Sequence, residues 1–193
     1  MEIRRAETVQ CIYFSPTGST KKIVETVAEG TGFRLLPAVD ITTPSKRQSW
    51  SGQIEGDLLV VGVPVYTGRF PALVLEPFAR LIGNGSWAVP IAVCGNVRMG
   101  TCLADLCALL RRQGFTIPAA GNFIAQHSFA CGEFPIGRGR PDDLDLKIAA
   151  EFGADVAERV RDHVPDITSV YRDHIYIRMY VSGQLDAPGF TSL

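Results

Sequence analysis

The chain has 193 residues, of which 46% are hydrophobic and 20% are charged, and its formal net charge is −1. This length favours one domain with a buried core, and the near balance of charge gives no indication of nucleic acid or an anionic membrane surface as a partner. No apolar run reaches the length of about 18 residues that a membrane span needs, and the N-terminus lacks the apolar region of a signal peptide.

The first part of the chain predicts two strands on either side of a helix. Residues 8–14 form an apolar run with β-branched and aromatic residues, which is typical of a strand. After the turn S-P-T-G-S-T at 15–20, apolar residues recur at helical spacing until a pair of glycines ends the predicted helix. Residues 33–40 are predicted to form a second strand, and Pro37 within it favours an edge position. The Thr-, Ser-, Gly- and Pro-rich residues 42–56 are predicted to form a loop.

The rest of the chain alternates strands with helices. Strands are predicted over 57–63, 87–94 and 115–125, and helices over 73–82, 101–112 and 142–163. The first of these strands is almost continuously apolar, as expected for a parallel strand that is buried on both faces. Pro90 weakens the prediction of the second of them.

This alternation predicts an α/β fold with a mostly parallel sheet and helices on both faces. Five strands in about 160 residues fit the doubly wound order 2-1-3-4-5, in which a ligand binds at the carboxyl ends of the strands. We expect a single domain, 1–193, with its core at about 8–163 and a C-terminal extension at 164–193.

Three loops are expected to meet at that edge of the sheet: the first loop at 15–20, the second at 64–71 and the third at 94–100. The first loop has the composition of a phosphate-binding turn. Its four hydroxyl side chains precede a helix N-terminus, where backbone N–H groups are unpaired and the helix dipole is positive, and Gly18 allows close approach of an anion. The alternative is that Ser15 or Thr17 only caps the helix, but one hydroxyl would suffice for that.

Other phosphate-binding and metal-binding patterns are absent from the sequence. The first loop lacks the glycine spacing of G-x-x-x-x-G-K-S/T and of G-x-G-x-x-G, which disfavours nucleoside triphosphates and dinucleotides. The five cysteines are odd in number and form no C-x-x-C pair, which argues against a disulfide framework, a zinc site or an iron–sulfur cluster. We interpret them as small buried thiols of a cytoplasmic protein.

Several of these segments resemble a known family. The turn at 15–20 resembles the S/T-x-T-G-x-S/T loop that binds the FMN phosphate in flavodoxins. The run G-V-P-V-Y-T-G-R-F-P at 62–71 resembles the G-x-P-x-Y-x-G-R-x-P loop of the flavodoxin-like domain in a bacterial flavodoxin–ferredoxin fusion family. The segments G-N-V-R at 95–98, A-Q-H-S-F at 125–129 and P-D-D at 141–143 resemble that same family.

The resemblance covers about residues 8–163 and implies a flavodoxin-like three-layer sandwich with one non-covalent FMN that transfers one or two electrons. It implies these cofactor-binding residues: for the phosphate, Ser15, Pro16, Thr17, Gly18, Ser19 and Thr20; on one side of the isoalloxazine ring, Pro64, Val65, Tyr66, Thr67, Gly68 and Arg69; and on the other side, Gly95, Asn96, Val97 and Arg98. Tyr66 could instead be a loop aromatic packed on the sheet edge, Arg69 a solvated charge, and His127 either a ligand or a capping residue.

Two departures from the family leave the function open. Flavodoxins typically stack an aromatic residue of the third loop on the flavin, whereas this loop has Val97 and Met99. The fusion family continues into a cysteine-rich ferredoxin module, whereas residues 181–193 contain no cysteine. Either a ferredoxin-type iron–sulfur protein is a separate redox partner, or the chain was shortened, or this member works without one, and the three alternatives stay open.

The sequence favours an electron carrier without catalytic residues or metal ligands of its own, because no nucleophile lies beside an evident base. The alternative is an FMN-dependent NAD(P)H:quinone-type oxidoreductase, which the missing aromatic favours slightly. A third possibility is an interaction domain without flavin, against which the hydroxyl-rich first loop argues.

Overall fold

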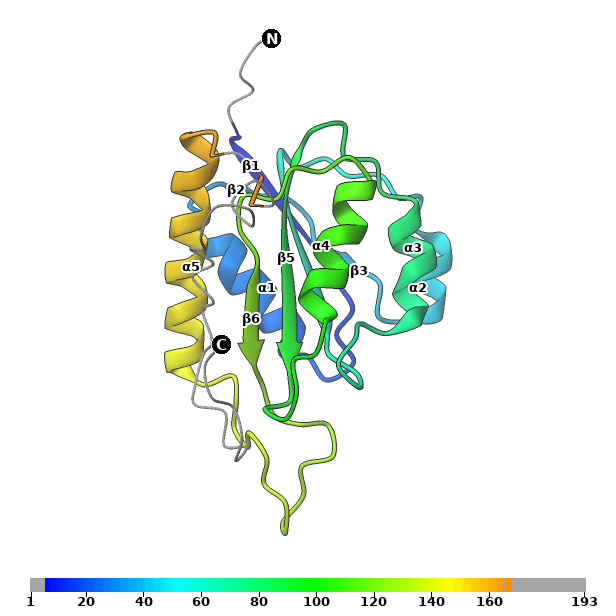
Figure 1. The fold of residues 1–193 in the computed structure, drawn as a ribbon, viewed down its shortest axis with the longest axis vertical. Helices are drawn as coiled ribbons and strands as arrows, with labels where there is room; N and C mark the ends of the chain where they lie inside the picture. The colour runs from blue at the N-terminus through cyan, green and yellow to red at the C-terminus, as the bar shows by residue number, and fades with distance from the viewer. Residues whose placement is uncertain (1–5, 165, 168–193) are drawn as a thin grey trace.

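The computed structural model describes residues 6–164, 166 and 167, which form a parallel sheet covered by helices (Figure 1). The strands are β1 (Thr8–Tyr13), β2 (Arg34–Leu35), β3 (Val39–Asp40), β4 (Leu58–Pro64), β5 (Trp87–Cys94) and β6 (Gly121–Ile124). The helices are α1 (Ser19–Gly30), α2 (Pro44–Ser49), the short 3-10 helix η1 (Ala72–Val74), α3 (Leu75–Ala79), α4 (Cys102–Arg112) and α5 (Asp143–Arg161).

The sheet has the order β2-β1-β4-β5-β6, and β3 also pairs with β1. β2 pairs with the start of β1 and β3 with its end, so the two short strands together occupy one edge position. Every one of these pairings is parallel. The predicted order 2-1-3-4-5 and the flavodoxin-like α/β class are therefore confirmed.

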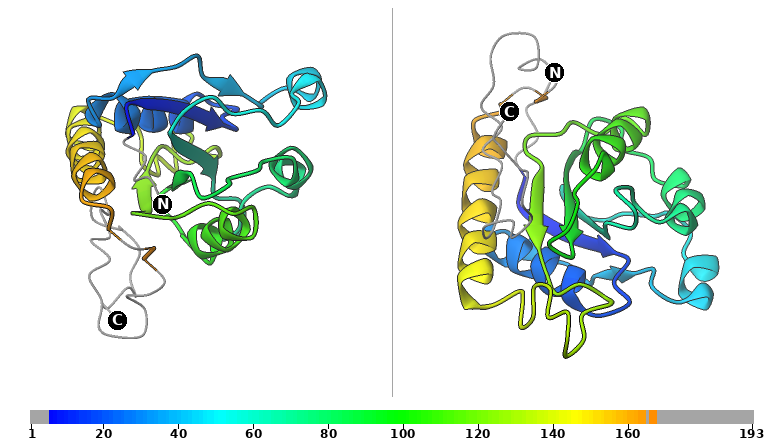
Figure 2. Two further views of the ribbon diagram at one scale, coloured as in Figure 1. Left: turned by 90° about the horizontal axis from the view of Figure 1, so that it is seen from above. Right: turned by 60° about the horizontal axis from the view of Figure 1, so that its bottom comes forward.

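Helices cover both faces of the sheet and bury a separate apolar cluster on each. α1 and α5 lie on one face, and α3 and α4 lie on the other, as the two views in Figure 2 show. Within β4, Leu58 and Val60 face α1 and α5, whereas Leu59, Val61 and Val63 belong to the opposite cluster. Burial on both faces explains why the sequence of β4 is almost continuously apolar.

Four predicted segments differ from the observed ones. The predicted strand 33–40 is split into β2 and β3, because Pro37 between them lacks the N–H that a continuous ladder would need. The predicted loop 42–56 contains α2, which begins with Thr43 as N-cap and Pro44 in its first turn. The predicted helix 73–82 is only η1 followed by α3.

The predicted strand 115–125 is the fourth of these segments, since only β6 is regular strand within it. Thr116 makes an isolated bridge to Trp87, and regular pairing with β5 begins later, at Ile91. Pro90 precedes that pairing, so β5 tolerates a proline although it lies between β4 and β6.

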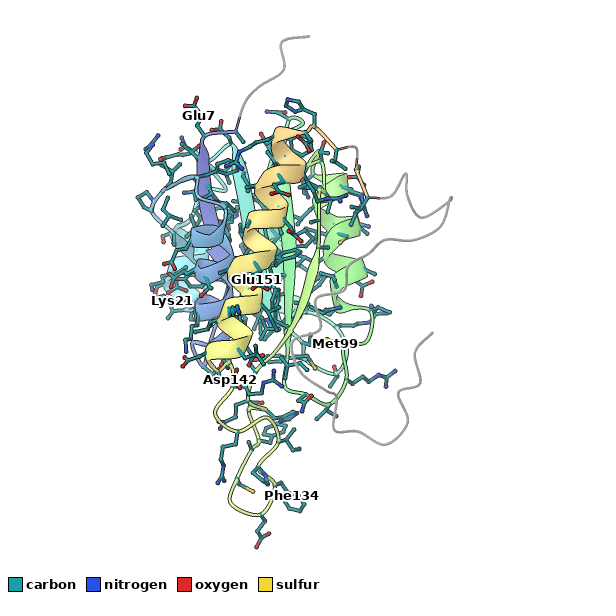
Figure 3. All side chains as sticks on the ribbon, turned by 90° about the vertical axis from the view of Figure 1, so that its left-hand side faces the viewer. Glu7, Lys21, Met99, Phe134, Asp142 and Glu151 are labelled. Carbon is teal, nitrogen blue, oxygen red and sulfur yellow. The ribbon has the colours of Figure 1, made fainter. Side chains whose placement is uncertain are left out.

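A long excursion, residues 126–140, leaves the sheet between β6 and α5 and projects beyond it, with Phe134 far out in Figure 3. Its two ends are joined where the N–H of Gln126 donates to the carbonyl of Arg140 at 2.9 Å. Arg140 also forms an ion pair with the fully buried Asp145 in the first turn of α5. Asp142 and Asp145 form a capping box there, so the excursion ends on a rigid helix start.

Of the predicted C-terminal extension, only residues 164, 166 and 167 lie within the described part, and the remainder falls outside it. Asp166 pairs with Arg111 at 2.9 Å, which holds this point of the chain against the end of α4. Among the described helices, none has an apolar stretch that could span a bilayer.

Candidate functional site

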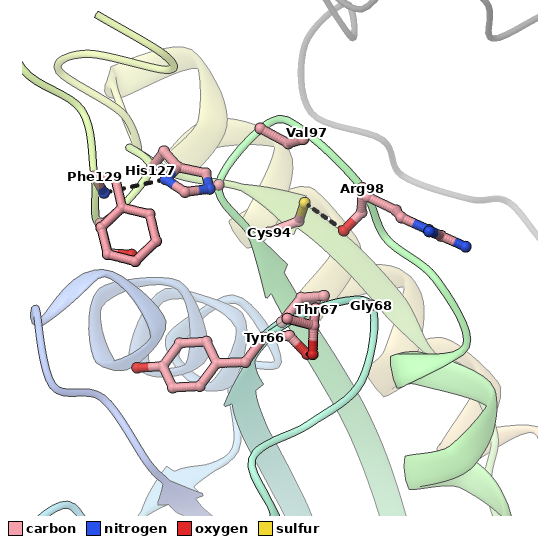
Figure 4. Close-up of a pocket in the computed structure, with 11 residues that line it drawn as sticks. Tyr66, Thr67, Gly68, Cys94, Val97, Arg98, His127 and Phe129 are labelled. Atoms are coloured by element: carbon pink, nitrogen blue, oxygen red, sulfur yellow. Dashed lines mark hydrogen bonds between the residues drawn. The ribbon is translucent and has the colours of Figure 1, made fainter. Parts of the chain in front are cut away.

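Two adjoining cavities lie at the carboxyl ends of the central strands, where the first, second and third loops meet. Figure 4 shows the residues that line the larger one. The larger has a volume of about 650 Å³ and the smaller about 60 Å³. The larger volume is typical of a small-molecule site. The residues that border both cavities are Val65, Tyr66, Cys94, Gly95, His127 and Ser128.

The first loop carries the chain from β1 into α1 and forms one side of the smaller cavity. Gly18 is the N-cap of α1 with a φ of +85°, a conformation that glycine adopts without strain. The hydroxyl oxygen of Ser15 accepts a hydrogen bond from the N–H of Lys21 at 2.9 Å. Ser15 therefore does cap the first turn of α1, as considered from the sequence.

The other hydroxyls of the first loop are available to a ligand. Thr17, Ser19 and Thr20 line the smaller cavity, and Thr17 Oγ1 donates to Ser19 Oγ at a long 3.4 Å. Within the described part of the chain, the N–H groups of Ser19 and Thr20 have no hydrogen-bond acceptor. The first turn of α1 contains no acidic residue that would repel an anion. Hydroxyls, unpaired N–H groups and the positive end of the helix dipole thus converge on a pocket suited to a phosphate-sized anion.

The second loop contains a tight turn that carries Tyr66 at the cavity wall. The N–H of Tyr66 donates to the carbonyl of Arg69 at 2.7 Å, and the N–H of Arg69 donates back at 3.0 Å. The two central residues, Thr67 and Gly68, have φ values of +49° and +84°, as in a type I′ turn. Positive φ is strained for a β-branched residue such as Thr67, and strain of this kind gathers at ligand sites.

The second and third loops are tied together at two glycines. The carbonyl of Gly68 accepts a hydrogen bond from the N–H of Thr101 at 2.8 Å. A Cβ atom on Gly100 would lie only 2.2 Å from that same carbonyl oxygen. Direct backbone contact therefore fixes the relative position of the two loops that border the larger cavity.

The third loop borders the larger cavity with Gly95, Val97 and Arg98. Val97 is 44% exposed, and the carbonyl of Arg98 accepts a hydrogen bond from Cys94 Sγ at 3.1 Å. Asn96 differs from its neighbours, because its side chain is buried and does not line either cavity. Its φ of +59° turns the loop, and its Oδ1 has no hydrogen-bond partner in the described part of the structure.

A fourth segment, residues 125–129, completes the cavities. Phe129 is 83% exposed, and its ring centroid lies 5.4 Å from that of His127. Figure 4 shows this pair on one side of the larger cavity and Tyr66 on the other. The segment after β6 therefore places an aromatic residue at the border of the larger cavity, whereas the third loop contributes none. The sequence signal for it was the resemblance of A-Q-H-S-F, which singled out His127 but not Phe129.

The structure brings most of the predicted site residues to these cavities. Those that line one or both are Pro16, Thr17, Ser19, Thr20, Pro64, Val65, Tyr66, Thr67, Gly68, Gly95, Val97 and Arg98. Ser15, Gly18, Arg69 and Asn96 do not line them. The side chain of Arg69 is 75% exposed and lies 3.9 Å from Asp105. The lining residues that the sequence did not single out are Val93, Cys94, Ala125, Gln126, Ser128 and Phe129.

Thiol groups are distributed unevenly around the site. Cys131 lies in the excursion and is exposed, whereas the other four cysteines are buried. Burial raises the pKa of Cys11 and Cys102 to about 12 and that of Cys107 to about 11, so these thiols stay protonated at neutral pH. Within the described residues, no group of His, Cys, Asp and Glu side chains is arranged to hold a metal ion.

Comparison with known proteins supports the fold. No family model matches the sequence, and no curated protein sequence matches it significantly. A flavodoxin from the domain Archaea is similar in structure, with a TM-score of 0.54 at 16% identity over 80% of this chain and 99% of the other. A flavodoxin from Streptococcus pneumoniae TIGR4 gives a TM-score of 0.52 at 18% identity over 81% and 99%. A flavone reductase gives 0.57 at 12% identity over 81% of this chain and 64% of the other.

These identities are too low to carry an activity from one protein to another, so the comparisons show the flavodoxin-like fold alone.

Proposed function

We propose that this chain binds one FMN molecule non-covalently in the two cavities and acts as a flavodoxin-like electron-transfer protein. The observation that carries the proposal is the joining of a small, hydroxyl-lined pocket at the N-terminus of α1 to a larger cavity walled by aromatic and apolar groups. FMN has the matching pair of parts, a terminal phosphate and a planar apolar ring. The proposal is supported by the position of both cavities at the carboxyl ends of the strands, the edge at which doubly wound sheets bind ligands.

The smaller cavity fits the phosphate. Thr17, Ser19 and Thr20 offer hydroxyl donors, and the N–H groups of Ser19 and Thr20 are unpaired within the described structure. Hydrogen bonds from such donors to a charged oxygen are stronger than those between neutral groups. No lysine is needed in the pocket, because the helix N-terminus supplies the positive potential.

The larger cavity fits the ring. Tyr66 and Phe129 present aromatic surface, and Val65 and Val97 present aliphatic surface. Gly68 and Gly95 line this cavity, and the absence of a Cβ at each lets the loops pack closely around it, against Gly100 and His127 respectively. We propose that Gly95, Val97 and Arg98 flank the ring from the third loop and that the second loop flanks it from the other side.

Bound FMN would supply one- and two-electron transfer, and the protein would supply binding, orientation and exclusion of water. The lining residues include no nucleophile hydrogen-bonded to a base, which favours a carrier over an enzyme with its own acid–base machinery. The resemblance to the fusion family suggests a ferredoxin-type iron–sulfur protein as the redox partner.

An FMN-dependent NAD(P)H:quinone-type oxidoreductase is the second candidate, and the larger cavity favours it. Its volume of about 650 Å³ and the exposed aromatic residues at its border, Tyr66 and Phe129, leave the cavity accessible to a second substrate. The flavone reductase of similar fold has an enzymatic name, but its identity of 12% supports only the fold.

The test is the visible absorption spectrum of the protein purified without added flavin, followed by titration of the flavin-free protein with FMN. Flavin absorption bands and saturable FMN binding are expected. A colourless protein that FMN does not bind would refute the proposal and would favour an interaction domain without flavin. NAD(P)H oxidation by the loaded protein, with a quinone as acceptor, would favour the oxidoreductase over the carrier.

A further inference from the structure

His127 occupies the junction of the two cavities and borders both. Its backbone N–H donates to the carbonyl of Ile136 at 3.1 Å, which fixes it against the returning arm of the excursion. Its ring lies on the backbone of Gly95, where a Cβ atom would approach His127 Cδ2 to 2.7 Å. A side chain held by these contacts has little freedom to turn away from the cavity.

The hydrogen bonding of His127 determines which ring nitrogen carries the proton. Nδ1 accepts a hydrogen bond from the backbone N–H of Phe129 at 3.1 Å. An accepting nitrogen has no hydrogen in the neutral imidazole, so the proton is on Nε2. Within the described part of the chain, Nε2 has no hydrogen-bond acceptor. The cavity wall therefore contains an oriented N–H donor that no acceptor in the described part of the chain satisfies.

Three other polar side chains around the larger cavity, those of Thr67, Arg98 and Ser128, do not offer an equivalent donor. The hydroxyl of Thr67 already donates to the carbonyl of Tyr66 at 2.8 Å. The guanidinium of Arg98 points away from the cavity in Figure 4. Ser128 is exposed, and its hydroxyl is free to rotate toward solvent.

We infer that His127 is a binding residue for the ring of the bound flavin, to which its Nε2–H donates a hydrogen bond; this inference rests on the proposed function. The ring is assigned rather than the phosphate because His127 packs on Gly95 of the third loop, whereas the phosphate donors Thr17, Ser19 and Thr20 belong to the first. The ligand atom that Nε2–H meets must be an acceptor, a ring carbonyl oxygen or an unprotonated ring nitrogen. His127 thereby adds a specific hydrogen-bond donor to the wall of this cavity.

The experiment compares FMN and riboflavin, which share the ring but differ in the phosphate. Flavin-free protein is titrated with each ligand, and binding is followed by quenching of flavin fluorescence. The variant H127L removes the donor, whereas H127Q keeps an N–H donor. The control H163Q changes a histidine at the far end of α5, where His163 stacks on Trp87 with ring centroids 6.3 Å apart.

We expect H127L to weaken both FMN and riboflavin by the same factor of about 3- to 10-fold, the size of one neutral hydrogen bond. H127Q should recover most of the affinity, and H163Q should bind as the wild type does. In the flavin-free protein, long-range ¹H–¹⁵N NMR should show the Nε2–H tautomer of His127, and the Nε2 signal should shift when FMN is added.

Three results would overturn the inference. Wild-type affinity in H127L would show that His127 does not touch the ligand. A loss for FMN but not for riboflavin would place His127 at the phosphate. The Nδ1–H tautomer in the NMR spectrum would remove the donor itself, because its Nε2 carries no proton. None of these results touches the proposed function, which fails only if the wild-type protein does not bind FMN.

Discussion

Removal of two hydroxyls from the first loop, in the double variant T17A/S19A, should weaken FMN binding without affecting riboflavin. Both side chains line the smaller cavity, and their oxygens lie 3.4 Å apart, close enough to serve one phosphate group. A hydrogen bond to a charged acceptor contributes about 1.5–3 kcal/mol, and the exposure of Thr17 reduces this to about 1–2 kcal/mol for each hydroxyl. The total of about 2–4 kcal/mol corresponds to a rise in Kd of about 30- to 700-fold.

The assay is the same fluorescence titration, with riboflavin as the ligand that lacks the phosphate. T26A is the matched control, because Thr26 lies on α1 beyond the cavity and its hydroxyl donates to the carbonyl of Lys22 at 2.8 Å. T26A should bind FMN normally. If T17A/S19A binds FMN as the wild type does, or if it loses riboflavin to the same extent, the smaller cavity is not the phosphate site and the argument from the helix N-terminus is wrong.

Four further predictions concern single residues. Y66A should weaken FMN binding by at least about 2- to 12-fold, since aromatic packing contributes about 0.5–1.5 kcal/mol beyond buried area, and an unchanged titration would remove Tyr66 from the ring site. G100A should lower Tm and FMN affinity, because its Cβ would collide with the carbonyl of Gly68 in the second loop. The control G85A has open space around it, so its Tm should fall only by the strain of placing alanine at a φ of +81°. Equal losses of Tm in the two variants would contradict the collision. D145A should lower the free energy of unfolding in urea by about 3–5 kcal/mol, because it leaves a mostly buried arginine without its carboxylate partner, and a loss below 1 kcal/mol would refute this. At pH 8 one thiol of the folded protein should react with Ellman's reagent, and C131S should abolish that reaction, because the four other thiols are buried; rapid reaction of two or more would disagree with the structure.

The parts of the fold that could be predicted are those in which burial leaves a periodic or continuous apolar pattern. β4 is buried on both faces and was recognised from its sequence, as was the long amphipathic α5. α2 buries no residue, so it has no apolar pattern to reveal it, although Thr43 and Pro44 carry the composition of a helix start. Short strands such as β2 and β3 owe their existence to pairing with β1, which local composition does not encode.

The candidate site could be predicted only where the composition of a single loop indicates its function. The first loop has a hydroxyl-rich composition that a turn does not otherwise need, and its residues line the smaller cavity. The sequence does not predict Phe129 as a site residue, because an exposed aromatic residue in a long connection belongs to no periodic apolar pattern. Its place beside His127 depends on how the excursion folds back, and the contact between Gly68 and Gly100 likewise depends on two loops meeting in space.

The hydrogen bond that closes the excursion also determines how its length can change without disturbing the sheet. Because the bond between Gln126 and Arg140 joins the ends of the segment, residues added or removed beyond it need not move β6 or α5. The entropy of closing a loop grows only logarithmically, by about 0.6 kcal/mol for each doubling of its length. Insertions in this segment therefore cost the fold little free energy, and the residues at its base, which border the cavities, keep their positions. The chain can in this way exchange its outer contact surface for another during evolution, or accept a grafted one by design, and keep the same pocket.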